Sequence, residues 1–223
     1  DGAQALFARY RGRPLGSAGA AAALSFHQTK NVTCGEGGAL LLNDPALFER
    51  AEVVRDKGTD RRRFVRGDVE QYTWVDLGSS YAPSELLAAC LAAQLRRADE
   101  VQARRCAAWQ RYHDGLSAWA ASRGVRLPYV PDHCEQPFHL FYLLLPSRGR
   151  RDGLLQFLRE RGIQATFHYQ PLHQSTFGRR YGQAMGECPV STDVSGRLIR
   201  LPLYTSMTTA EIDLVIEAVC QFR

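Results

Sequence analysis

Residues 25–31, SFHQTKN, and the glycine-rich residues 35–38, GEGG, constrain this chain more than any other stretch. An apolar run over 20–26 predicts a short strand before them, and a second apolar run over 39–42 predicts another strand after them. The polar turn therefore places Lys30 at the rim of a strand. Burial disfavours the charged form of a lysine, and a neutral amine at such a place is a nucleophile for a carbonyl group.

Two interpretations of this turn remain open from the residues alone. A solvated lysine and ordinary turn glycines are the commoner explanation of such residues. The other is a cofactor site, in which Ser25 and backbone N–H groups hold a phosphate. The chain begins DGAQALFARYRGRPLGS, which adds a carboxylate, Asp1, upstream of the lysine. Enzymes that use pyridoxal phosphate pair its ring nitrogen with a charged side chain and bind its aldehyde on a lysine.

Similarity to a known family runs along almost the whole chain. It is carried by the opening segment, by SFHQTKNVTCGEGGALLLND, by residues 50–89, and by FHYQPLH and RLIRLPLY near the end. The chain resembles the DegT/StrS-type sugar-nucleotide aminotransferases. Within that family, the run from KGTDRRRF to YTWVDLGSSY is most similar to the subgroup that forms dTDP-4-amino-4,6-dideoxygalactose.

One departure from the wider family pattern accompanies this resemblance. Most members carry a GYNYR-like sequence where this chain has GSSYA, residues 78–82. Ser80 stands where the family asparagine reaches a cofactor phosphate, and Ala82 stands where an arginine often meets the substrate diphosphate. The subgroup shares this departure.

The resemblance implies an α/β protein of fold-type I, like aspartate aminotransferase. Residues 1–83 are expected to form the back half of the large cofactor-binding domain, with a mostly parallel sheet. Residues 84–119 are expected to be one long interdomain helix, and residues 120–223 a small α+β C-terminal domain. Because the chain has no initiator Met and the resemblance begins inside the large domain, we expect a fragment that lacks the enzyme's N-terminal part and is inactive alone.

Local patterns predict the elements of these domains. Leu87, Leu91 and Leu95 recur at helical spacing, and Thr208 with Glu211 forms a capping-box signature at the start of the last helix. Further elements are predicted as helices over 45–57 and 150–161 and strands over 138–145 and 163–167. The aromatic residues Tyr72, Trp74 and Tyr81 are expected in a core or an interface.

The family's functional positions are carried over residue by residue. Lys30 is expected to form the internal aldimine with pyridoxal 5'-phosphate and to shuttle the proton in catalysis. Asp1 matches the partner of the pyridine nitrogen, and Gln4 lies at the position near the phenolic oxygen. Ser25 and Ser80 match phosphate-binding positions.

Three further residues carry weaker expectations. His168 and His173, in FHYQPLH, are predicted to line the substrate side of the site, with a purely structural role as the alternative. Glu36 either contacts substrate or stabilises its turn. No metal site is expected, because the six cysteines form no C-x-x-C pair and the histidines no H-E-x-x-H pattern.

The resemblance implies transfer of an amino group, with glutamate as the donor, onto the C4 ketone of a dTDP-linked 4-keto-6-deoxyhexose. Action at C3, or on a UDP sugar, is the alternative within the family. A related sugar dehydratase branch has histidine in place of Lys30, so the lysine favours transamination. The implied setting is a cytoplasmic homodimer with a shared active site, in polysaccharide biosynthesis such as that of enterobacterial common antigen.

Charge leaves one alternative of another class. The net charge is +5, and six basic residues cluster over 55–66, which suits an anion-binding module as well as an enzyme for an anionic substrate. Nucleic acid is not expected as a partner, because this run lacks interleaved aromatic residues. No apolar run approaches the ~20 residues of a membrane helix, and the cysteines are expected to be reduced thiols.

Overall fold

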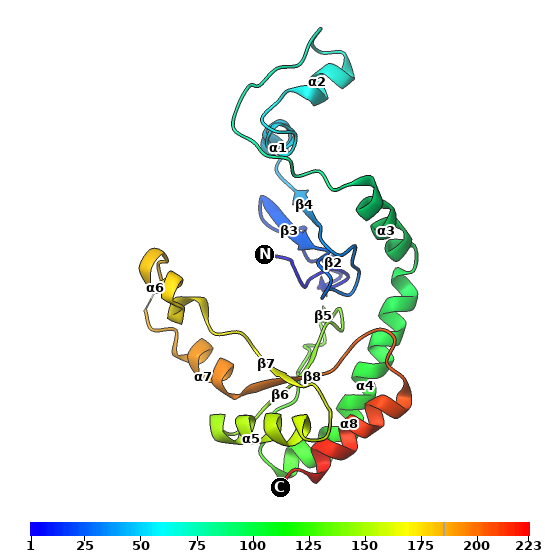
Figure 1. Cartoon of the computed structure of the whole chain (residues 1–223), viewed down its shortest axis with the longest axis vertical. Helices are drawn as coiled ribbons and strands as arrows, with labels where there is room; N and C mark the ends of the chain where they lie inside the picture. The colour runs from blue at the N-terminus through cyan, green and yellow to red at the C-terminus, as the bar shows by residue number, and fades with distance from the viewer. Residues whose placement is uncertain (185) are drawn as a thin grey trace. The chain divides into compact units, whose positions relative to one another are not determined.

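The computed structural model describes residues 1–184 and 186–223. The chain divides into two compact units (Figure 1). Unit 1 contains Asp1–Asp99 and Pro131–Pro137, and unit 2 contains Glu100–Val130 and Phe138–Arg223. Each unit is therefore built from two separate segments of the chain.

Unit 1 contains short strands and several helices. Its strands are β1 (Arg9–Tyr10), β2 (Arg13–Pro14), β3 (Ala21–Ser25), β4 (Gly38–Leu42) and β5 (Cys134–Glu135). Its helices are the 3-10 helix Pro45–Leu47, α1 (Phe48–Arg55), α2 (Arg61–Arg66) and α3 (Glu85–Arg96). The helix predicted over 45–57 is confirmed as the 3-10 turn and α1, capped by the Asp44 side chain, which accepts from the Ala46 N–H.

The pair β3–β4 is a hairpin whose closed end carries residues 26–37. Ala21 pairs with Leu42, and Ser25 pairs with Gly38, in antiparallel register. The expected mostly parallel arrangement is wrong for this chain: among the described residues every pairing between two strands is antiparallel, and a parallel contact occurs only as the isolated bridge of His27 with Gly35. The connection between β3 and β4, residues 26–37, contains no helix, and a parallel crossover usually needs one.

A small apolar cluster lies at the closed end of the hairpin. Phe26, Val32 and Cys34 are buried there, and Val32 is fully buried. Leu87 and Leu91 from α3 pack against this cluster, as the helical spacing predicted. The turn that carries Lys30 is therefore supported from within unit 1.

Unit 2 is a three-stranded sheet in the order β6–β8–β7 with helices packed on it. Its elements are α4 (Ala98–Ser122, which begins in unit 1), β6 (Phe141–Leu144), α5 (Arg148–Arg159), β7 (Thr166–Phe167), the 3-10 helix Leu172–Gln174, α6 (Thr176–Tyr181), α7 (Pro189–Arg197), β8 (Leu198–Leu201) and α8 (Thr209–Gln221). The core includes fully buried Tyr112, Phe141, Leu154, Ile199 and Val219. The capping box of α8 is present as predicted.

The long helix expected over 84–119 is instead two helices. Arg97 separates α3 from α4, with φ −103° and ψ 16°, outside the helical range. The two units divide at Asp99, close to this break. The assignment of 1–83, 84–119 and 120–223 to domains of the complete enzyme stays a prediction.

The described residues contain neither a candidate membrane span nor a candidate metal cluster. No helix in that part of the chain is long and apolar enough to cross a membrane. No group of three or more His, Cys, Asp or Glu side chains there is placed to hold a metal ion.

Candidate active site

Backbone hydrogen bonds hold the turn that carries Lys30. The Lys30 N–H donates to the His27 carbonyl over 2.9 Å, and the Gln28 N–H donates to the Gly35 carbonyl over 2.8 Å. Gly35 has a φ of +90°, a conformation that glycine adopts without steric cost. Lys30 itself is half-buried, directly before the buried pair Asn31 and Val32.

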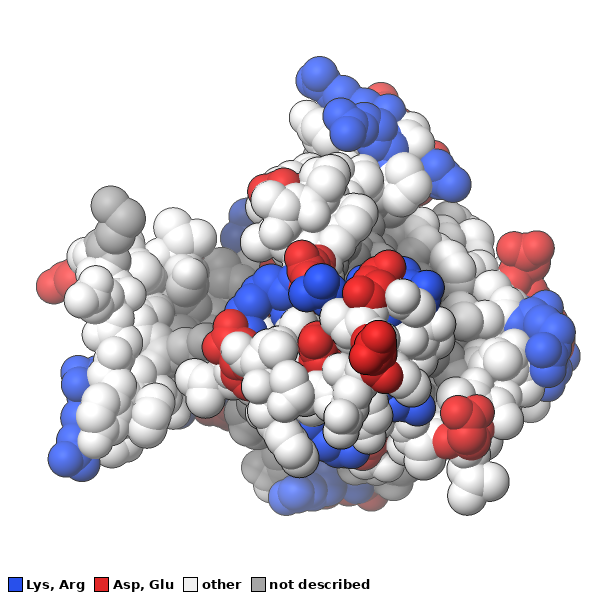
Figure 2. Space-filling view, turned by 90° about the horizontal axis from the view of Figure 1, so that it is seen from above, with Lys and Arg blue, Asp and Glu red and all other residues white. Residues whose placement is uncertain are grey.

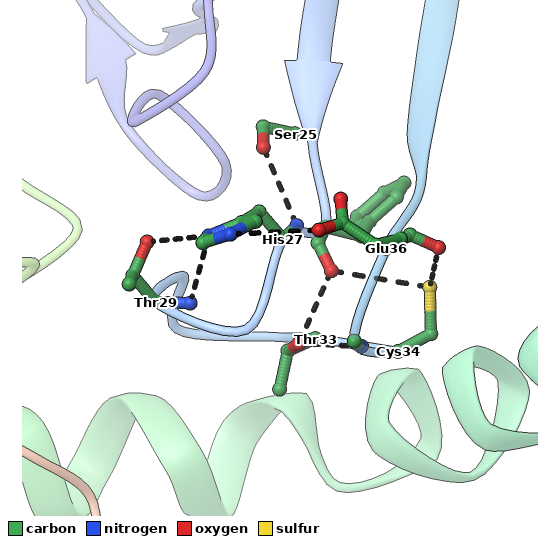
Figure 3. Close-up of polar contacts among 8 residues, drawn as sticks. Ser25, His27, Thr29, Thr33, Cys34 and Glu36 are labelled. Atoms are coloured by element: carbon green, nitrogen blue, oxygen red, sulfur yellow. Dashed lines mark hydrogen bonds and ion pairs between the residues drawn. The ribbon is translucent and has the colours of Figure 1, made fainter.

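The side chain of His27 lies between Thr29 and Glu36 in this turn (Figure 3). Its Nδ1 accepts from the Thr29 N–H at 3.2 Å and lies 2.9 Å from Thr29 Oγ1. In the neutral ring the proton is then on Nε2, which faces Glu36 Oε1 at 3.7 Å. Glu36 therefore has a contact within the turn, which agrees with its stabilising interpretation.

The GEGG side of the turn is held by Thr33 and Cys34. Thr33 Oγ1 donates to the Phe26 carbonyl and accepts from the Gly35 N–H, and Cys34 Sγ donates to the Glu36 carbonyl over 3.3 Å (Figure 3). A Cβ on Gly37 would lie 2.6 Å from Cys34 Sγ. This close approach explains a glycine at that position.

The start of the chain runs beside the same hairpin. The Gly2 N–H donates to the carbonyl of Ala23, the middle residue of β3, over 2.8 Å, so the segment that begins with Asp1 runs beside the strand that contains Ser25. Asp1 Oδ1 accepts from the Ala3 N–H. Gln4 is exposed in the turn that follows. The structure thus brings Asp1, Ser25 and Lys30 to neighbouring segments of unit 1.

These side chains fit the chemistry of pyridoxal phosphate. Ser25 Oγ accepts from the His27 N–H at 3.3 Å, which leaves its own proton to donate to a phosphate oxygen. Asp1 offers a carboxylate for the ring nitrogen, and Lys30 offers an amine for the aldehyde. This set of a carboxylate, a hydroxyl and an amine therefore fits that cofactor.

Ser80 lies elsewhere in unit 1. It forms an isolated antiparallel bridge with Asp56, just after α1, while Ser79 and Tyr81 bond to carbonyls of α1. β4 runs from Gly38, which pairs with Ser25, to Leu42, and α1 comes after Leu42. The Ser80 segment, which contacts α1, therefore follows the end of β4 that is opposite to Ser25. The hydrogen bonds of Ser80's segment therefore join it to α1 and not to the Lys30 turn.

Three of the six basic side chains of the segment 55–66 pair with acidic neighbours. Figure 2 looks down from the α1–α2 end of Figure 1 and shows acidic and basic side chains next to one another on that face. The ion pairs are Arg62 with Asp56, Arg63 with Glu49, and Arg66 with Glu52 and Asp68. Such paired charges weigh against the anion-binding module as the main role of this segment.

His168 and His173 both lie in unit 2. His168 follows β7 and lines a cavity of about 750 Å³, whereas His173 Nε2 lies 3.2 Å from Thr192 Oγ1. Burial, and then the charge of Arg200, lower the pKa of His168, so its ring is neutral at pH 7. The structure brings the two histidines into one unit, and their substrate role stays a prediction.

His27 has no role predicted from the sequence, although its side chain contacts both Thr29 and Glu36 in the Lys30 turn. The available signal was its place between Ser25 and Lys30 in the motif. A histidine in a turn has no distinctive spacing, so only the folded turn identifies its partners, Thr29 and Glu36.

Comparison with known sequences gives consistent relatives. The chain is 36% identical over 222 residues to a dTDP-3-amino-3,4,6-trideoxy-alpha-D-glucose transaminase of Micromonospora megalomicea subsp. nigra. It is 33% identical over 218 residues to the erythromycin biosynthesis sensory transduction protein EryC1 of Saccharopolyspora erythraea. The alignments cover 98% and 97% of this chain and 56% of each relative. The chain thus spans a little over half the length of these relatives.

Solved structures give the same result for the fold. DesV of S. venezuelae, in complex with a ketimine intermediate, superposes with a TM-score of 0.83 at 32% identity, over 99% of this chain and 56% of DesV. The PLP form of the sugar aminotransferase Spr1654 of Streptococcus pneumoniae gives 0.81 at 26% identity, over 97% of this chain and 55% of that one. The α/β fold-type I class is confirmed. The sequence pattern of the DegT/DnrJ/EryC1/StrS aminotransferase family matches residues 1–220, and the chain belongs to that family.

Proposed function

We propose that the protein containing this chain is a pyridoxal-phosphate-dependent aminotransferase that acts on a nucleotide-linked keto sugar. The observation that supports this proposal is that Ser25 and Lys30 lie at the closed end of the β3–β4 hairpin, while the segment that begins with Asp1 hydrogen-bonds to β3 at Ala23.

Each of these side chains has a distinct task. The amine of Lys30 would hold the cofactor covalently and, once the amino group of the donor has displaced it, the free amine would move a proton at the donor α-carbon. The carboxylate of Asp1 holds a proton on the ring nitrogen. The hydroxyl of Ser25 donates to the phosphate. Pyridoxal phosphate, when bound, supplies an electron sink that the protein's own side chains lack.

The substrate is proposed to be a dTDP-linked 4-keto-6-deoxyhexose, aminated at C4 with glutamate as donor. The similarity of residues 57–81 to the C4 subgroup supports this choice. Amination at C3 is the second candidate, because two relatives carry the name dTDP-3-amino-3,4,6-trideoxy-alpha-D-glucose transaminase.

An assay with synthetic substrates tests both candidates. The purified enzyme is incubated with pyridoxal phosphate, glutamate, and either a dTDP-4-keto or a dTDP-3-keto deoxysugar, and the product is examined by NMR. Amine at C4 alone supports the first candidate, and amine at C3 alone supports the second. Failure to aminate either sugar, with cofactor bound and the protein folded, would remove the proposal.

A homodimer with shared active sites is proposed for the same protein. Two observations support it. Ser80 belongs to a segment whose hydrogen bonds join it to α1, so its predicted phosphate contact suits a neighbouring subunit. Trp74, Leu77 and Leu86 are 77%, 83% and 80% exposed, and apolar side chains of this size are the kind that an interface covers.

A further inference from the structure

A cavity in unit 2 has a lining that the proposed reaction does not use. It lies between the N-terminal end of α5, the residues that follow β7, and the C-terminal end of α7, and its volume is about 750 Å³. Its charged and polar lining includes Ser147, Arg148, Arg151, His168, Asp193 and Arg197. Three arginines thus face a single aspartate among the described lining residues.

Arg151 is the most informative of these side chains. It is only 7% exposed, and its Nη1 is buried without a hydrogen-bond partner among the described residues. Its Nε donates to Asp152 Oδ1 over 2.7 Å. The Nε atom of the guanidinium group therefore has an acceptor among the described residues, and the Nη1 atom has none there. A buried, charged donor without an acceptor is costly, so Nη1 of Arg151 favours an acceptor that the described residues do not supply.

The helix that carries Arg151 adds a second feature. α5 has 12 residues, begins at Arg148 after the N-cap Ser147, and has no acidic residue in its first turn. The free N–H groups and the dipole of such a helix end favour an anion. Arg148 lies in that first turn with 78% of its side chain exposed.

The acidic neighbours do not cancel this charge. Asp193 pairs with Arg197, which lowers the pKa of that carboxyl group, and Arg197 also donates to the Leu145 carbonyl. Asp152 pairs with Arg151 at 2.7 Å and lies 3.7 Å from Arg148. Arg148 therefore has only a long, exposed ion pair, which contributes little.

We propose that this cavity binds a phosphate-type oxyanion, with Arg151 and Arg148 as its cationic ligands and the first turn of α5 as its amide donor. Arginine suits this task because its planar group offers paired donors to phosphate oxygens. Free phosphate or pyrophosphate, and the diphosphate of a nucleotide, share this chemistry. The inference does not depend on the proposed transamination.

Calorimetric titration of the protein loaded with pyridoxal phosphate tests the site, since the Ser25 turn is then already filled. Inorganic phosphate, pyrophosphate and dTDP are titrated separately, and dTDP is also titrated in the presence of pyrophosphate. The expected result is saturable binding of pyrophosphate. Competition by dTDP identifies a nucleotide diphosphate as the ligand, and binding without competition identifies the free anion.

Two variants and one control locate the site. The Arg148 side chain is exposed, so Arg148→Gln leaves the core intact. This variant is expected to weaken pyrophosphate binding about tenfold, or roughly 1.4 kcal/mol. Arg151→Lys keeps the charge but lacks the second donor edge, and it is expected to bind more weakly still. Arg159→Gln, at the far end of α5, is the control with unchanged binding. Absence of saturable binding to the parent protein, or equal affinity in Arg148→Gln and Arg159→Gln, would overturn the proposal.

Discussion

At the scale of single residues, Lys30 carries the most specific expectation. The chain contains one other lysine, Lys57, which is exposed and sits at a φ of +66°. The two lysines therefore give a matched comparison within one protein. Lys30 lies half-buried in the turn after Ser25, and Lys57 lies in an exposed loop. We therefore expect the cofactor to form its covalent bond with Lys30 and not with Lys57.

Lys30→Ala is expected to abolish covalent attachment of the cofactor and turnover, because the amine that bonds to the aldehyde is removed. Borohydride reduction followed by peptide mapping measures the attachment. Lys57→Asn is the control, since asparagine tolerates the left-handed conformation, and it should keep both properties. A reduced label on Lys57, or on any lysine other than Lys30, would contradict the assignment.

Asp1→Asn is expected to retain cofactor binding and lose most of the rate, on the order of 10²-fold, because an amide cannot stabilise a protonated ring nitrogen as a carboxylate does. Rates and the visible absorbance of the bound cofactor separate the two effects. Asp132→Asn, at an exposed position, is the control. Turnover at the parental rate in Asp1→Asn would exclude Asp1 as the ring partner.

At the scale of elements, two glycines decide how the segment that bears Ser80 meets α1. A Cβ on Gly78 would lie 2.1 Å from the Gly58 nitrogen and 2.8 Å from the Val54 carbonyl oxygen. Gly58 has a φ of +78° and faces the Asp76 carbonyl oxygen, which a Cβ would approach to 1.9 Å. The two backbones pack directly on each other, and no side chain fits between them.

Gly78→Ala is therefore expected to destabilise unit 1 by about 1–3 kcal/mol, as overpacking does elsewhere. Thermal unfolding followed by circular dichroism measures the change. Gly149→Ala is the matched control, because a Cβ there meets nothing within 4 Å and Gly149 lies in α5. That control should be neutral or slightly stabilising. Equal stability of Gly78→Ala and the parent protein would show that the loop rearranges freely.

At the scale of the whole molecule, the shared site makes a prediction about mixtures. Lys30→Ala and Ser80→Asp are each expected to be inactive, the second because its carboxylate repels a phosphate. If the two residues serve one site from different subunits of a two-fold dimer, re-assembled mixtures contain one intact site in each mixed dimer. Equal mixing should then restore about a quarter of the parental activity.

The control mixture pairs Lys30→Ala with Asp1→Asn. Asp1 and Lys30 lie on adjoining segments of one chain, so no mixed dimer regains a complete site and the activity should stay low. Subunit exchange is verified with differently tagged proteins. Restoration by neither mixture, with exchange demonstrated and all variants dimeric, would mean that the site is not shared in this way.

The sequence by itself determined the helix caps, the apolar faces of the helices and the turn motif, because each of these depends on residues that are only a few positions apart. Asp44 and Thr208 cap helices as their types predict, and Leu87 and Leu91 meet the cluster around Val32 because helical spacing puts them on one face. The motif from Ser25 to Lys30 could also be recognised from the sequence alone, and so could the family, because both depend on the order of residues along the chain.

Other features were decided only by tertiary structure. The break at Arg97 interrupts an otherwise continuous helical pattern, and the antiparallel pairing of β3 with β4 follows from which strand lies next in space. The unpartnered Nη1 of Arg151, the partners of His27 and the backbone contact between Gly58 and Gly78 join groups that are separate along the chain. Sequence determines such contacts only through the whole fold, because burial and proximity between distant residues have no local pattern.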